Sequence, residues 1–137
     1  MSAPITVLVY SDNRSTRQRA IAALGSRPVA DLPEFRYLEV ATPAMVVQRM
    51  DSDGVDLAIL DGEAAPAGGM GVAKQLKDEL DICPPLIVLT GRPIDDWLAR
   101  WSRADAAVPH PLDPATLTAA VVGALRTRLQ TKPVQVS

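Results

Sequence analysis

The chain has 137 residues, of which 47% are hydrophobic and 22% are charged, and its formal net charge is -2 at pH 7. This length fits one domain with a sizeable core and leaves no room for two. The sequence lacks the excess of basic over acidic residues that nucleic-acid binding normally needs. No apolar run approaches the roughly 20 residues of a membrane span, and no signal peptide is evident. We therefore expect a cytoplasmic globular domain that binds no nucleic acid and inserts into no membrane.

Five short apolar segments predict five strands, at 5–10, 36–41, 55–60, 85–90 and 105–109. Three of them contain nearly continuous apolar runs, "TVLVY", "DLAIL" and "LIVL". Such runs are typical of strands that are covered on both faces. A parallel sheet is therefore predicted. The single cysteine, Cys83, has no partner for an internal disulfide, and we expect it to be a buried thiol.

Helical patterns alternate with these strands, at 14–25, 42–50, 71–80, 93–103 and 113–129. Thr42 and Asp113 each precede a proline and are predicted N-caps, and Gly25 is a predicted helix stop. The alternation predicts an α/β fold, a doubly wound, right-handed parallel sheet with helices on both faces. Residues 1–130 are expected to form this domain, and residues 131–137 a flexible C-terminal tail.

Polar residues follow the predicted strands at the edge where ligands of such sheets bind. They are Ser11, Asp12, Asn13, Asp61, Glu63, Thr90 and His110. Asp12 alone is equally well explained as a turn residue. Taken together, the set suits phosphoryl chemistry, because a carboxylate can attack phosphorus when Mg²⁺, a hydroxyl and a cation offset the negative charge.

Each of these roles can be assigned to a residue. Asp12 and Asp61, with a backbone carbonyl near Glu63, are the predicted Mg²⁺ ligands. Thr90 is expected to hydrogen-bond a phosphoryl oxygen, and His110 to balance the remaining charge.

Four segments in register, "VLVYSDN", "VDLAILDGE", "PLIVLTG" and "VPHPLDP", carry a family resemblance. From about residue 5 to residue 130 the sequence resembles the receiver domain of bacterial two-component response regulators. The resemblance implies a flavodoxin-like strand order of 2-1-3-4-5 and a signalling protein that is not an enzyme. It implies that a partner histidine kinase phosphorylates Asp61, that Asp12 helps to bind Mg²⁺, that Thr90 contacts the phosphate, and that a cis peptide bond precedes Pro111.

The sequence departs from the family pattern in four places. Ser11 replaces the first of two acids, so we expect weak Mg²⁺ binding. Ala107 stands at the usual aromatic position, and the loop at 63–71 is one residue longer than usual. His110 stands where the family has lysine. One possibility is that the His110 side chain points toward the acids, where it is a cation only when protonated. The other is that it caps a helix or faces water.

Three functions are compatible with these residues. The first is a stand-alone receiver, phosphorylated at Asp61, that contacts a downstream protein and has no DNA-binding output domain. The second is a pseudo-receiver that binds a protein partner without phosphorylation. The third is a flavodoxin-type carrier of flavin or nucleotide, which is weakest because no hydroxyl- and glycine-rich phosphate loop follows the first strand.

Both tryptophans, Trp97 and Trp101, fall on one stripe of the predicted helix at 93–103. The stripe is either a core-facing surface or a docking surface, because tryptophan is enriched where partners bind. In receivers this fourth helix belongs to the surface that meets downstream partners. The oligomeric state stays open, with a homodimer through the face of the fourth and fifth helices as one arrangement.

Overall fold

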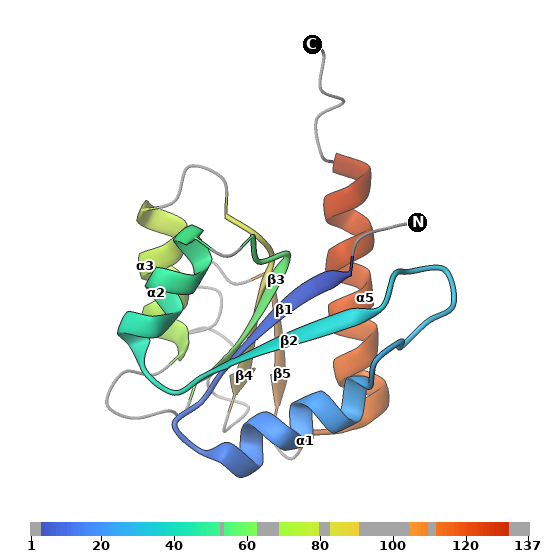
Figure 1. Cartoon of the computed structure of the whole chain (residues 1–137), viewed down its shortest axis with the longest axis horizontal. Helices are drawn as coiled ribbons and strands as arrows, with labels where there is room; N and C mark the ends of the chain where they lie inside the picture. Colours follow the sequence, from blue (N-terminus) through green and yellow to red (C-terminus); the bar gives the residue numbers. More distant parts are fainter. Residues whose placement is uncertain are drawn as a thin grey trace.

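The computed structural model describes residues 4–52, 54–62, 69–79, 83–90, 105–109 and 112–131. Five strands form one parallel sheet in the order β2-β1-β3-β4-β5. They are β1 (Ile5–Tyr10), β2 (Phe35–Val40), β3 (Leu57–Asp61), β4 (Leu86–Thr90) and β5 (Ala106–Pro109). Figure 1 shows this sheet between two layers of helices. The predicted fold class and strand order are confirmed.

The described helices are α1 (Arg14–Leu24), α2 (Pro43–Ser52), α3 (Gly69–Glu79) and α5 (Pro114–Thr131). Helices α1 and α5 cover one face of the sheet, and α2 and α3 cover the other (Figure 1). The helix predicted at 93–103 lies outside the described residues, as do residues 132–137 of the predicted tail.

The predicted helix ends are confirmed by their hydrogen bonds. The Thr42 hydroxyl accepts the Met45 N–H at 3.3 Å, and the Asp113 carboxylate accepts the N–H of Thr116 at 2.9 Å. Hydrogen bonds from the Thr116 side chain and backbone lower the pKa of Asp113. Gly25 ends α1 with φ of 70°, a left-handed conformation that favours glycine. These local patterns therefore set the start and stop of three helices.

The two faces of the sheet bury two separate apolar clusters. Along β1, Val7 and Val9 face α1 and α5, while Leu8 and Tyr10 face α2 and α3. This is the alternation expected of a strand buried on both sides. Cys83 packs only partly buried against the second cluster, so the expectation of a fully buried thiol was wrong. It lies just before β4, at the margin of the sheet.

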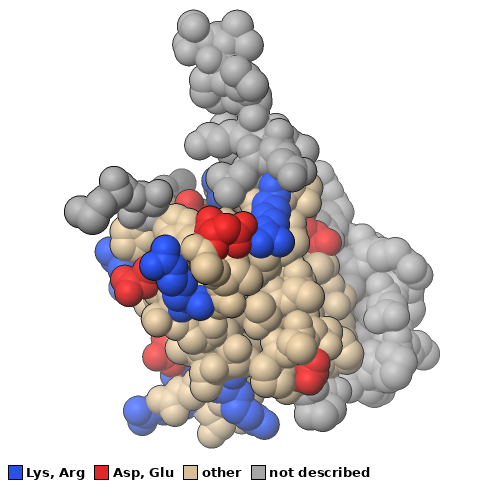
Figure 2. Space-filling model, turned by 90° about the vertical axis from the view of Figure 1, so that its right-hand side faces the viewer, with Lys and Arg blue, Asp and Glu red and all other residues tan. Residues whose placement is uncertain are grey.

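Charged side chains of both signs lie around a mostly uncharged centre on the face shown in Figure 2. Within the described residues, one exposed pair joins Arg126 of α5 to Asp31 of the loop between α1 and β2, at 2.9 Å. Exposed pairs of this kind contribute little to stability.

Among the helices that the structure describes, none is long and apolar enough for a membrane crossing.

Tyr37 of β2 forms a hydrogen bond with the end of α1, and its ionisation makes the free energy of unfolding vary with pH in the alkaline range. Its hydroxyl donates to the Gly25 carbonyl oxygen, and burial raises its pKa from 10.0 to about 12. Because the unfolded chain loses this proton first, the stabilisation is complete below pH 10 and is lost as the pH rises toward 12. We expect the free energy of unfolding to fall by about 1–2 kcal/mol through this group. Urea unfolding of the wild type and Tyr37→Phe across this range measures it, and parallel curves would contradict the assignment.

Candidate functional site

Asp61 lies at the carboxyl end of the central strand β3 and is only 4% exposed. Strand β3 pairs with β1 on one side and with β4 on the other, and Asp61 is in register with Leu89 of β4. The next residue, Gly62, donates its N–H to the Leu89 carbonyl oxygen at 2.8 Å. The strand pairing therefore continues to the point where the Asp61 carboxylate leaves the sheet.

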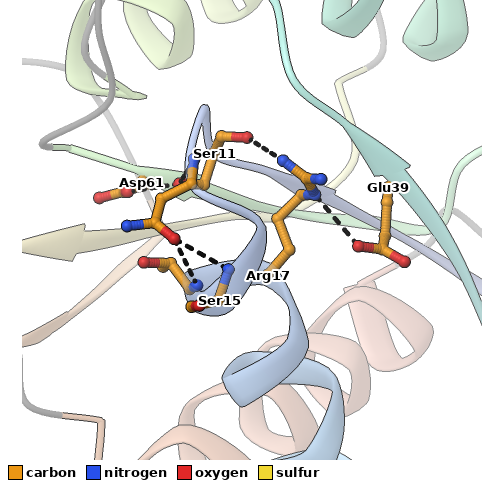
Figure 3. Close-up of polar contacts among 7 residues, drawn as sticks. Ser11, Ser15, Arg17, Glu39 and Asp61 are labelled. Atoms are coloured by element: carbon orange, nitrogen blue, oxygen red, sulfur yellow. Dashed lines mark hydrogen bonds and ion pairs between the residues drawn. The ribbon is translucent and has the colours of Figure 1, made fainter.

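The Ser11 hydroxyl contacts Asp61 directly. Its Oγ lies 2.8 Å from Asp61 Oδ2, although the two residues are 50 positions apart in the sequence (Figure 3). The Ser11 side chain is completely buried, and its Oγ also accepts the Asn13 backbone N–H at 3.0 Å. Asn13 is the N-cap of α1, because its Oδ1 accepts the Ser15 N–H at 2.8 Å. The serine therefore joins the start of α1 to the acid of β3.

Arg17 of α1 links the Ser11 backbone to Glu39 of β2. Its Nη1 donates to the Ser11 carbonyl oxygen at 2.7 Å, and its Nε lies 3.1 Å from Glu39 Oε1 (Figure 3). The Arg17 side chain is 14% exposed and that of Glu39 is 41% exposed. Sequence reasoning missed both residues. Nothing in the local pattern separates them from ordinary surface charges, because the contact spans two elements.

Asp12 and Tyr10 complete the end of β1. Asp12 is exposed, whereas Tyr10 is fully buried in the apolar cluster under α2 and α3. Burial raises the pKa of the Tyr10 phenol, and the negative charges of Asp12 and Asp61 raise it further. Both carboxylates therefore lie within electrostatic reach of one buried hydroxyl.

Thr90 is the last residue of β4 and is almost fully buried. It directly follows Leu89, the sheet partner of Asp61. A hydroxyl and a carboxylate thus end two adjacent strands. In the neighbouring strand β5, Ala107 pairs with Val88 and is exposed. No bulky side chain stands at that position.

Several predicted site residues lie outside the described part of the chain. These are Glu63, Trp97, Trp101, His110 and Pro111. Their roles stay predictions from the sequence. Among the described residues, the structure brings together Ser11, Asp12, Asp61 and Thr90 at one edge of the sheet.

The fit of Mg²⁺ can be judged from the acids that are described. Asp12 and Asp61 are two carboxylates at neighbouring strand ends, and Mg²⁺ commonly takes one or two carboxylates together with waters. Within the described ranges, no group of three or more candidate ligands is present. The Ser11 hydroxyl, which lies 2.8 Å from Asp61 Oδ2, adds no charge to the site. The two acids therefore suit Mg²⁺, but with few charged ligands.

An acid ends the central strand of this 2-1-3-4-5 sheet, and a second acid and a hydroxyl lie at the adjacent strand ends, as the resemblance to receiver domains implies. Comparison of folds agrees. The signal receiver domain of a Luxo repressor protein from Vibrio parahaemolyticus superposes with a TM-score of 0.82 at 18% identity, covering 98% of this chain and 100% of that one. The chemotaxis response regulator CheY4 of Vibrio cholerae gives 0.74 at 17% identity, covering 89% and 99%.

Sequence comparison establishes the family. The chain is 62% identical over 125 residues to response regulatory proteins of two Mycobacterium tuberculosis strains, CDC 1551 and H37Rv. The match covers 91% of this chain and 94% of each relative. No family model matches the chain. The chain belongs to the response regulators of two-component systems and is a receiver domain of that family.

Proposed function

We propose that this chain is a receiver domain that accepts a phosphoryl group on Asp61 from a histidine kinase and signals by contact with a downstream protein. The position of Asp61 carries the proposal. It ends the central strand, is 4% exposed, and has the Ser11 hydroxyl 2.8 Å from one carboxylate oxygen. Receiver domains are typically signalling proteins that act on other proteins, which supports a non-enzymatic role in the cytoplasm.

The residues at the site divide the chemistry among them. Asp61 is the nucleophile, and together with the exposed Asp12 it would hold Mg²⁺. The bound ion would offset the negative charge that otherwise repels the phosphoryl group. The Thr90 hydroxyl, which is buried, would donate to a phosphoryl oxygen. Glu63 would add a backbone carbonyl ligand, and His110 a second cation when protonated.

Intact mass spectrometry tests the proposal. The chain is incubated with a small phosphodonor, such as phosphoramidate, with and without Mg²⁺. We expect the mass of one phosphoryl group to be added, faster with Mg²⁺, and borohydride reduction followed by peptide mapping should place it on Asp61. A chain that gains no phosphoryl group at any Mg²⁺ concentration would rule out the proposal.

A pseudo-receiver is the second candidate, and the substitution of an acid by Ser11 favours it. The Ser11 hydroxyl donates to Asp61 but adds no charged metal ligand, and Ala107 stands where receivers usually have an aromatic residue. Such a domain would bind its partner in one constitutive state. It would take up no phosphoryl group, and Asp61→Asn would bind the downstream partner as tightly as the wild type does.

A further inference from the structure

We propose that Ser11 is a positioning residue for Asp61, and that its hydroxyl holds the carboxylate in the orientation that reacts with phosphorus. The inference rests on the proposed phosphorylation of Asp61 and deepens it. It assigns a role to Ser11, which is one of the four places where the sequence departs from the family pattern. The serine is thus a donor that orients the nucleophile, rather than only the loss of a metal ligand.

The direction of the hydrogen bond follows from the number of protons available. A serine hydroxyl has one proton to donate and two lone pairs that accept. The Asn13 backbone N–H can only donate, so its 3.0 Å contact uses a lone pair of Ser11 Oγ. An ionised carboxylate can only accept. The single hydroxyl proton of Ser11 therefore points to Asp61 Oδ2, across 2.8 Å.

The backbone of Ser11 is fixed by hydrogen bonds as well. Its N–H donates to the Val40 carbonyl oxygen at 3.2 Å, and its carbonyl oxygen accepts from Arg17 at 2.7 Å. Arg17 is in turn paired with Glu39. Because the serine is completely buried, water does not compete for its hydroxyl. A donor fixed in this way can hold a nucleophile in its productive geometry before the reaction begins.

The consequence for phosphoryl transfer is a carboxylate held in one orientation before the phosphodonor arrives. One carboxylate oxygen of Asp61 forms a bond to phosphorus as the bond from phosphorus to the donor's leaving group breaks. The leaving group takes the electron pair and a proton from solvent, and Asp61 exchanges none. The other oxygen becomes the carbonyl oxygen of the acyl phosphate.

Three variants test this assignment by their rates of labelling with phosphoramidate and Mg²⁺. Ser11→Ala removes the donor and should slow labelling about ten-fold. Ser11→Thr keeps a hydroxyl and should recover a rate within about two-fold of the wild type, provided that thermal melting shows it folded. Ser15→Ala changes an exposed serine of α1, four residues further along the chain, and should have no effect. Where Ser11→Ala does not fold, Ser11→Cys, a weak donor, takes its place.

The outcomes separate this inference from the proposed function. Wild-type labelling on Asp61 at a rate that Ser11→Ala matches would overturn the role of Ser11 alone. Absence of labelling in the wild type would overturn the proposed function. In that case the side-chain rotamer of Asp61 tests whether Ser11 positions it. By NMR couplings, Asp61 should keep one χ1 rotamer in the wild type and Ser11→Thr but average between rotamers in Ser11→Ala. One shared rotamer in all three proteins would contradict positioning by Ser11.

Discussion

Asp61→Asn should gain no phosphoryl group under conditions that label the wild-type chain completely. An amide is not a nucleophile toward phosphorus, so the reaction loses its acceptor atom rather than part of its rate. The fold should persist, because asparagine has nearly the same shape and its amide oxygen can still accept the Ser11 hydroxyl that lies 2.8 Å from Asp61. Intact mass after incubation with phosphoramidate and Mg²⁺, paired with a thermal melt, measures both expectations.

Asp12→Asn is the matched control for this experiment. It removes the exposed carboxylate of the same edge without touching the acceptor. Labelling should continue on Asp61 but be slower by about ten-fold, because one charged ligand of the proposed Mg²⁺ site is lost. Undiminished labelling of Asp61→Asn would show that the phosphoryl group goes to another residue, and the assignment of Asp61 would be wrong.

Ser11→Asp should bind Mg²⁺ at least ten-fold more tightly than the wild type, whose affinity we expect to be weak. Affinity in oxygen-ligand sites rises with the number of charged ligands, and the new carboxylate would stand next to Asp61. Without metal, the same change places two like charges together at a fully buried position. The variant should therefore melt at a lower temperature than the wild type and regain stability when Mg²⁺ is added.

NMR titration of the Asp12 and Asp61 amides with Mg²⁺ measures the affinity, and thermal melting measures the recovery. An ion present at about 100 times its Kd stabilises the folded state by about 2.7 kcal/mol, so the recovery is large enough to detect. Ser11→Asn is the control, because it has a similar shape and adds no charge; its affinity should equal that of the wild type. Saturation of the wild type at low micromolar Mg²⁺, or equal affinities for all three proteins, would contradict this prediction.

Much of the fold was predictable because its signals are local. The apolar run of β1, predicted and observed at 5–10, buries both of its faces, and β2 and β4 were each predicted to within one residue. The caps at Thr42 and Asp113 depend on atoms within three residues of each other. Helix α5 shows the predicted four-residue spacing of its buried side chains, which are Leu117, Val121 and Leu125.

The sequence by itself determined the alternation of strands and helices and the polar residues at the strand ends. Both follow from hydrophobic periodicity and chain direction. Only the tertiary structure decided how those residues are joined. In the sequence, Ser11 is simply a missing acid; in the structure it donates to Asp61, 50 positions away, and is held through Arg17 by Glu39. Such contacts depend on sheet register and helix placement, which bring distant residues within hydrogen-bonding distance and which no local pattern specifies.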